Sequence, residues 1–237
     1  MLEEKDANEF AAQLAGATTR VVRDYEDEDV VGEPAFSDQL CGRLKETLED
    51  FETETIQWQV DVAAHLKGFG RLKARTLSSW KEEPELGADI VMVLDVDTPD
   101  FIVRKGFLAQ AKRLEPSKWI DPGEHRRLIE QCEKMLYVTP ASMVFLYSAS
   151  GVHVVPAAAV LQHKGRNLYD LLTYDTFTLY RDFAICWFGD PRIQATDRLT
   201  LASLRETLDT NAAVRFVGRA RDPEEVDWSE PDPEWPS

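Results

Sequence analysis

The fold is decided by GADIVMVLDV (87–96) and FIVRKGFLAQAKRL (101–114), two runs separated by the turn DTPD (97–100). The first run is almost wholly apolar, which is typical of a buried strand. The second predicts a strand that returns antiparallel beside the first, with Gly106 as a bulge or bend. Outward from this hairpin, the sequence alternates between helical and strand patterns.

Upstream of the hairpin, the sequence predicts two helices and two strands. Ser37 is the expected N-cap of a helix that ends near Phe51, and the segment 72–80 is a candidate return strand. The apolar stripe of the helix consists of Leu40, Leu44, Leu48 and Phe51. The strand alternates Trp58, Val60 and Val62 with polar residues. Still earlier, a short helix is expected over 7–14, with a break at Gly16.

Downstream, a helix over 121–136 should start at Asp121 as N-cap with Pro122 at its first position. Two strands, 142–150 and 151–157, should meet at Ser150–Gly151. A helical stretch near 168–188, a helix near 201–208 and a short edge strand at 214–218 complete the pattern. The order helix, strand, strand, strand, helix, strand predicts an α/β sandwich with a mixed central sheet.

Composition narrows the class of protein. A chain of 237 residues that is 43% hydrophobic can build a large core, so global disorder is excluded. No apolar run is long enough to span a membrane, and the acidic start does not resemble a secretory signal. Three cysteines without a CxxC pair predict neither a zinc ribbon nor a disulfide framework. We therefore expect a reduced, cytoplasmic protein.

The net charge of −16 is concentrated at the two ends of the chain. Residues 1–35 carry ten acidic and three basic side chains, and residues 222–237 carry seven acidic and no basic ones, which leaves −2 for residues 36–221. We expect an acidic N-terminal extension (1–35), one folded domain (36–221) and a disordered acidic tail (222–237). Trp228 and Trp235 in that tail are candidate anchors for a protein partner. Because the body is nearly neutral, it can still hold a local basic groove.

Strand alternation can bring three chemically useful side chains together if the two strands present the right faces. Asp89 shares a face with Val91, and Gln110 and Lys112 share a face of the neighbouring strand. A carboxylate, an amide oxygen and an ammonium group on one spot suit metal-assisted phosphodiester hydrolysis. Asp89 and Gln110, or the Ala111 carbonyl, would hold Mg²⁺ (or Mn²⁺), and Lys112 would position water and offset charge.

These residues also match a known pattern. Glu85-Leu-Gly-Ala-Asp89 followed by Gln110-Ala-Lys112 resembles the PD-(D/E)xK nuclease superfamily, in its QxK branch of Mrr-like restriction enzymes. The resemblance covers roughly residues 37–150 and implies a restriction-endonuclease-like αβββαβ core, with Gln131 on the helix after the motif. It implies a metal-dependent endonuclease acting on DNA, with a role in phage defence or restriction. The implied catalytic residues are Asp89, Gln110 and Lys112.

One family feature is missing. The family usually adds a glutamate from its first helix, but Glu46 and Glu49 fall opposite the leucine stripe and Glu52 lies at its edge. Glu85 is the better substitute, so the expected metal ligands are Glu85, Asp89 and Gln110. A local basic groove is expected from the following residues: Lys105, Lys112, Arg113, Lys118, Arg126 and Arg127.

Other interpretations stay open. Asp89 and Lys112 could form a buried ion pair without catalysis. The protein could be a non-catalytic interaction subunit of the same fold that binds a partner through its acidic ends. An acidic DNA mimic would need acid spread over a folded face, whereas here it lies at the ends. Homo-oligomerisation stays open as well.

Overall fold

The computed structural model describes residues 2–27, 33–49, 51–64 and 86–221. The expected return strand at 72–80, Glu85 and the acidic tail lie outside the described residues. The helices are α1 (Glu4–Asp27), α2 (Glu33–Leu48), α3 (Pro122–Val138), α4 (Ala157–Gln162), α5 (Thr176–Ala184), α6 (Arg198–Thr207) and the 3₁₀ turn η1 (Leu168–Asp170). The strands are β1 (Ile56–Ala64), β2 (Ile90–Thr98), β3 (Phe101–Arg113), β4 (Ser142–Ser148), β5 (Gly151–Pro156), β6 (Tyr174–Asp175) and β7 (Ala212–Ala220).

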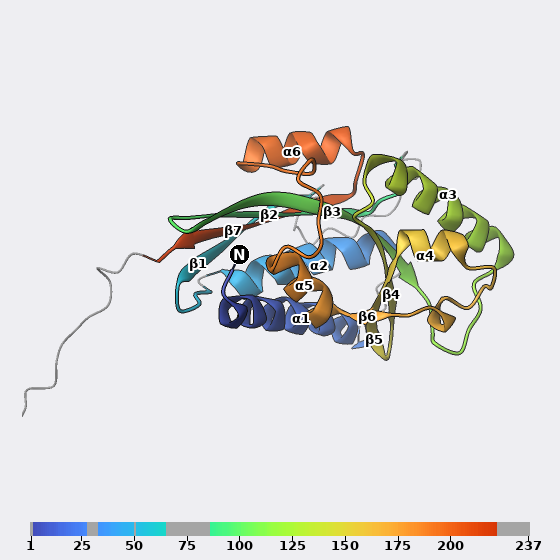
Figure 1. The fold of residues 1–237 in the computed structure, drawn as a ribbon. Helices are drawn as coiled ribbons and strands as arrows, with labels where there is room; N and C mark the ends of the chain where they lie inside the picture. The colour runs from blue at the N-terminus through green and yellow to red at the C-terminus, as the bar shows by residue number, and fades with distance from the viewer. Residues whose placement is uncertain (1, 28–32, 50, 65–85, 222–237) are drawn as a thin grey trace, which may run out of the picture.

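Seven strands form one mixed sheet in the order β1-β7-β2-β3-β4-β5-β6. β7 runs parallel to β2 and β4 runs parallel to β3, while the other neighbours are antiparallel. Helices cover both faces, with α1, α2 and α5 on one side and α3 and α6 on the other (Figure 1). The expected α/β class with a mixed, helix-flanked sheet is confirmed.

Alternation along β2 divides its side chains between two cores. Ile90 and Met92 face α1 and α2, whereas Val91 and Val93 pack with α3 and α6. Both sets are fully buried, which explains why this strand reads as a continuous apolar run. The polar side chains of the candidate site share the face of the second set.

Several local predictions are confirmed. The Asp89–Leu114 region forms the expected antiparallel hairpin of β2 and β3, and β4 and β5 pair with Ser148 opposite Gly151. Asp121 caps α3 by accepting from the main-chain N–H of Gly123 at 2.8 Å. Along the chain, α2-β1-β2-β3-α3-β4 follows the expected order of elements, and β7 is added in space between β1 and β2.

The expected break at Gly16 is wrong, because α1 continues through it to Asp27. Interior glycine costs a helix about 1 kcal/mol, but the helix buries Phe10, Leu14 and Val21 in the main core. Burial of each such side chain contributes roughly 1.5–3 kcal/mol and outweighs that cost. Residues from the segment expected to be an extension thus pack against the sheet, where the Phe10 ring stacks on Trp58 at 4.2 Å between ring centres.

Two further helix predictions are wrong. Ser37 is not an N-cap, since α2 already begins at Glu33 and Ser37 is buried within it. The stretch near 168–188 is not one helix but η1, β6 and α5. Asp175 ends β6 and is the N-cap of α5, because its carboxylate accepts from the main-chain N–H of Thr178 at 2.6 Å.

The expected edge strand at 214–218 is instead the interior strand β7, nine residues long. Arg215 within β7 carries a charge of the kind that usually faces solvent. In the structure it is buried and pairs with Asp61 and Asp95. Gly106 is not a bulge either, since Val93 pairs with it in unbroken register. A Cβ on Gly106 would lie 2.6 Å from the Ile193 side chain, so glycine is required there for close approach of that segment.

None of the helices that the structure describes has both the length and the apolar character needed to cross a membrane.

Candidate active site

The start of β2 places Asp89 beside the middle of β3. Asp89 directly precedes Ile90, and its main-chain N–H donates to the Ala109 carbonyl at 2.9 Å. On β3, Gln110 donates its side-chain N–H to Asp89 Oδ2 at 2.7 Å. The structure therefore brings together Asp89 and Gln110, which strand alternation had placed on facing positions.

The Asp89 carboxylate is buried, with 5% of the residue exposed, and it accepts hydrogen bonds on both oxygens. Besides Gln110, Oδ2 accepts from the Ala111 main-chain N–H at 2.8 Å, and Oδ1 accepts from Asn211 Nδ2 at 3.0 Å. β2 begins opposite Ala109, so no β2 residue lies opposite Ala111 in the ladder. The carboxylate takes that place and satisfies a main-chain donor that would otherwise be unpaired.

The amide of Gln110 occupies the centre of the site. Its nitrogen lies 2.7 Å from Asp89 Oδ2 and 3.1 Å from the Ala111 carbonyl oxygen, to both of which it donates. Its oxygen, Oε1, is buried and has no hydrogen-bond partner among the described residues. Two hard oxygens therefore converge on one point, and a third is held close to them without a donor.

Lys112 lies two residues beyond Gln110 and hence on the same face of β3. Its ammonium nitrogen lies 3.4 Å from a carboxylate oxygen of Glu124 in the first turn of α3, and its side chain is 12% exposed. Lys112 thus pairs with Glu124 of α3, while Asp89 accepts from Gln110.

The residues present fit a hard divalent cation. Asp89 Oδ2, the Ala111 carbonyl and Gln110 Oε1 are the oxygen types that Mg²⁺ prefers, and the unpartnered Oε1 can reach the same point by rotation of the amide. Among the described residues, no group of three or more His, Cys, Asp or Glu side chains could hold a metal. Glu85, the other expected ligand, lies outside the described residues.

The acids of α2 belong to the other side of the sheet. Leu40, Leu44 and Leu48 of this helix pack into the core opposite the Asp89 face. Glu46 is exposed and pairs with Arg43 at 2.8 Å. Glu46 therefore lies in the helix layer on the other side of the sheet from Asp89.

Two further sets of polar residues on this face were not predicted from the sequence. The first is Asn211, which holds Asp89 from the residue before β7 and carries no signal in the sequence. The second is a charged network around Asp95, which is fully buried and pairs with Arg104, Arg215 and Arg219. A carboxylate within an apolar run is itself a signal, because a buried charge requires a partner.

Burial opposes ionisation of Asp95, but the hydrogen bonds from Arg215 and Arg219 outweigh it and lower the pKa of the carboxyl group. Arg215 also pairs with Asp61 of β1 at 2.7 Å. The network therefore ties β1, β7, β2 and β3 together at the end of the sheet away from Asp89.

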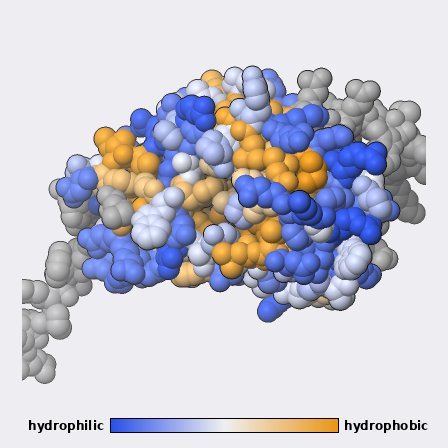
Figure 2. Space-filling view, turned by 45° about the vertical axis from the view of Figure 1, so that its right-hand side comes forward, coloured by the Kyte–Doolittle hydropathy of each residue, from blue (hydrophilic) through white to orange (hydrophobic). Residues whose placement is uncertain are grey.

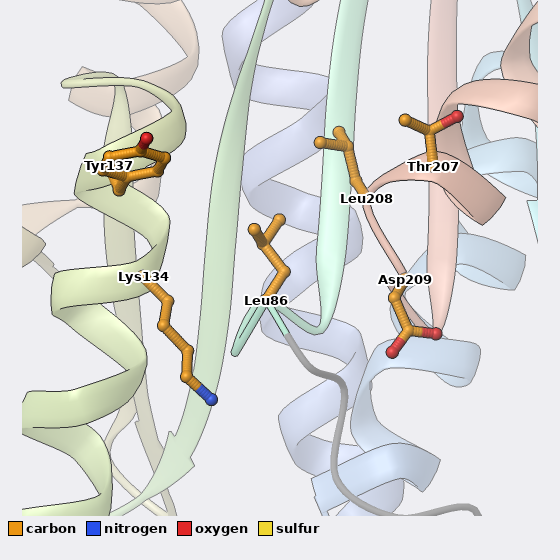
Figure 3. Close-up of a pocket in the computed structure, with 6 residues that line it drawn as sticks. All are labelled: Leu86, Lys134, Tyr137, Thr207, Leu208 and Asp209. Atoms are coloured by element: carbon orange, nitrogen blue, oxygen red, sulfur yellow. The ribbon is translucent and has the colours of Figure 1, made fainter.

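A pocket of about 300 Å³ opens beside the candidate site, between α3 and the end of α6 (Figure 3). Lys134 and Tyr137 line it from α3, and Leu86 lines it from the segment that leads to Asp89. Its other lining residues are Thr207, Leu208 and Asp209. A Cβ on Gly87, whose φ is +77°, would lie 2.7 Å from the main chain of Gln131, so this glycine lets α3 approach the site.

Lys105 does not lie with the other residues of the expected basic groove. Lys105 points to the opposite face of the sheet, where its ammonium donates to the Phe188 carbonyl at 2.7 Å and lies 5.0 Å from the centre of the Phe183 ring. Burial lowers the pKa of Lys105. The exposed members Arg113, Lys118, Arg126 and Arg127 lie around the β3–α3 connection, beyond Lys112.

No protein-family model, curated protein or solved structure matches this chain. The interpretation of the site therefore rests on its own geometry.

Proposed function

We propose that this protein is a metal-dependent endonuclease of the PD-(D/E)xK type, with a restriction-endonuclease-like core, that hydrolyses phosphodiester bonds in DNA. One observation carries the proposal: Asp89 Oδ2 and the Ala111 carbonyl converge on a single atom, the Gln110 amide nitrogen, at 2.7 and 3.1 Å. Two hard oxygens so close to one point are an arrangement that suits a cation. The order of elements from α2 to β4 also supports it.

Each residue then has a chemical role. Asp89, the Ala111 carbonyl and the unpartnered Oε1 of Gln110 would hold the cation. A bound Mg²⁺ lowers the pKa of water and neutralises charge on the phosphate. Lys112 leaves Glu124 when a phosphate arrives, donates to the phosphate oxygens and stabilises the charge that develops in the transition state.

A second function is favoured by a different observation. The Asp89 carboxylate already accepts from three N–H donors, and the Gln110 amide nitrogen fills the point where a cation would lie. A site satisfied in this way is also what a non-catalytic interaction subunit of the same fold would have. In that case the role of Asp89 is only to accept from the Ala111 main-chain N–H, where no β2 residue pairs with β3.

Cleavage assays with Lys112→Ala separate the two functions. On duplex and single-stranded DNA with Mg²⁺ or Mn²⁺, we expect wild-type cleavage, no cleavage in EDTA, and a loss of about 10²–10³-fold in rate for Lys112→Ala. Lys45→Ala, an exposed lysine of α2 in the other helix layer, is the matched control and should cut like wild type. Undiminished cleavage by folded Lys112→Ala protein contradicts the proposal, and absence of both cleavage and Mn²⁺ binding in the wild type favours the interaction subunit.

A further inference from the structure

Two loops join beside the β3 end of the candidate site. The β3–α3 connection (114–121) meets the segment 163–167 that follows α4, where the Ile120 N–H donates to the Arg166 carbonyl at 2.9 Å. Arg166 Nη1 donates back to the Ile120 carbonyl at 3.4 Å, and the Tyr169 hydroxyl donates to the Leu114 carbonyl at 2.8 Å. The two loops therefore form one continuous surface.

Trp119 projects from this surface. It is 70% exposed, and the guanidinium carbon of Arg166 lies 5.5 Å from the centre of its ring. A cation–π contact of this kind holds the indole in place. The side chain remains mostly open to solvent, although exposing so large an apolar ring is unfavourable without a ligand.

The surroundings of Trp119 are basic in a strongly acidic protein. Residues 112–127 hold five basic and three acidic side chains, and residues 163–167 hold two basic and no acidic ones, whereas the whole chain has a net charge of −16. Burial, followed by electrostatic interaction with His163 and Arg166, lowers the pKa of the neighbouring His125. This end of the molecule, turned forward in Figure 2, is largely hydrophilic with apolar patches between the polar side chains.

We propose that the Trp119 surface, formed by Lys118, Trp119, Lys164 and Arg166, binds a single-stranded segment of nucleic acid. One base stacks on Trp119, and the phosphates on either side contact the basic side chains. An aromatic side chain set among basic groups is the usual means of binding single strands. Only an unpaired base can stack on the ring, because the bases of a duplex already stack on one another.

The position of the surface links it to the candidate active site. Leu114, whose carbonyl joins the two loops, lies two residues beyond Lys112, so the surface adjoins the end of the strand that carries Lys112. The identity of the ligand as nucleic acid rests on the proposed function. Binding is measured without metal, so that it is independent of cleavage.

The test measures the fluorescence anisotropy of a labelled twelve-nucleotide oligothymidylate with the full chain in EDTA at low salt. We expect Trp119→Ala to raise the dissociation constant about tenfold. Trp187→Ala, which removes a tryptophan that is 78% exposed beyond α5, should leave it unchanged. Lys164→Ala should lower the slope of log affinity against log salt by about 0.7, the value for one phosphate contact on a single strand.

Three results would overturn the inference: no binding by the wild type, equal affinities of Trp119→Ala and Trp187→Ala, or equal binding of a blunt duplex. Melting curves of both tryptophan variants control for folding. If the oligonucleotide binds through Trp119 but is never cut with Mg²⁺ or Mn²⁺, this inference stands and the proposed nuclease function fails. If wild type and Trp119→Ala bind and cut equally, the nuclease stands and the inference fails.

Discussion

At the scale of single residues, Gln110 determines whether the site is stable without a metal ion. A neutral amide can donate to the Asp89 carboxylate at 2.7 Å and so stabilise the site without metal. A second carboxylate there would repel Asp89 unless a cation lay between them. The amide therefore stabilises the metal-free site, and under the proposed function Oε1 would be its ligand to a cation.

Gln110→Glu tests this property directly. We expect the variant to melt at a lower temperature than wild type in EDTA, and Mn²⁺ to restore the loss, because two adjacent carboxylates are stable only around a cation. Gln59→Glu on the exposed side of β1 is the matched control and should show neither effect. Thermal melting with and without Mn²⁺ measures both, and a Gln110→Glu protein that is insensitive to Mn²⁺ argues against a cation at this point.

A second prediction at the scale of single residues concerns the contribution of Glu85 to metal binding. Since the α2 acids lie on the other side of the sheet, Glu85→Gln should weaken Mn²⁺ binding more than Glu46→Gln or Glu49→Gln. Calorimetric titration of the three variants ranks them. A dominant effect of Glu46 or Glu49 would show that the metal is bound elsewhere.

At the scale of elements, β7 is held between β1 and β2 by buried charge. Asp95 of β2 is fully buried and Arg215 of β7 nearly so, and the two pair with each other. Removing one partner of such a pair leaves an uncompensated charge, which typically costs about 3–5 kcal/mol. The placement of β7 inside the sheet therefore depends on this network as well as on apolar packing.

Asp95→Asn should lower the free energy of unfolding by about 3 kcal/mol. Asp97→Asn, which removes the partly exposed carboxylate that pairs with Arg104 at 3.2 Å, should cost less than about 1 kcal/mol. Urea denaturation of both variants at neutral pH makes the comparison. Equal effects of the two substitutions would mean that the Asp95 network adds nothing beyond a surface ion pair.

The same network predicts how stability depends on pH. Because the pKa of Asp95 is lower in the folded protein than the usual value of about 3.9, its contribution is fully present above that pH. The contribution is lost as the pH falls through the folded pKa. Urea denaturation between pH 7 and pH 2 should therefore show a steeper acid loss for wild type than for Asp95→Asn, and parallel curves would contradict the role of Asp95.

At the scale of the whole molecule, charge is unevenly distributed between the ends of the chain and its body. The last sixteen residues carry seven acidic and no basic side chains, while the Trp119 surface is basic. A tethered polyanion competes with nucleic acid for basic groups at high effective concentration, and salt screens that competition. The acidic end of the chain thus becomes a candidate regulator of binding.

Deleting residues 222–237 should raise the affinity for DNA, most clearly at low salt, and should barely change the melting temperature. Anisotropy titrations at low and high salt, together with thermal melting, test both parts. Equal affinity with and without the segment at low salt excludes this competition and leaves docking of a protein partner. A loss of several degrees in melting temperature would indicate that the segment packs on the body through Trp228 and Trp235.

The sequence by itself determined the elements whose signals are local. The apolar run of β2, the return of β3, the Asp121 cap and the β4–β5 turn follow from periodicity and turn chemistry between close neighbours. The meeting of Asp89 and Gln110 also follows, because a short hairpin sets the register of its two strands.

Only the tertiary structure decided the features that depend on distant contacts. The sequence predicts β7 as an edge strand. Arg215 within it is buried because it pairs with Asp95, which lies 120 residues earlier in the chain. Helix α1 continues through Gly16 because packing of Phe10 against Trp58 of the sheet offsets the free-energy cost of an interior glycine. Asn211 joins Asp89 across 122 residues, and Lys105 turns away from the site toward Phe183. Periodicity shows which residues share a face, but only the assembled sheet shows which distant partner neutralises a buried charge.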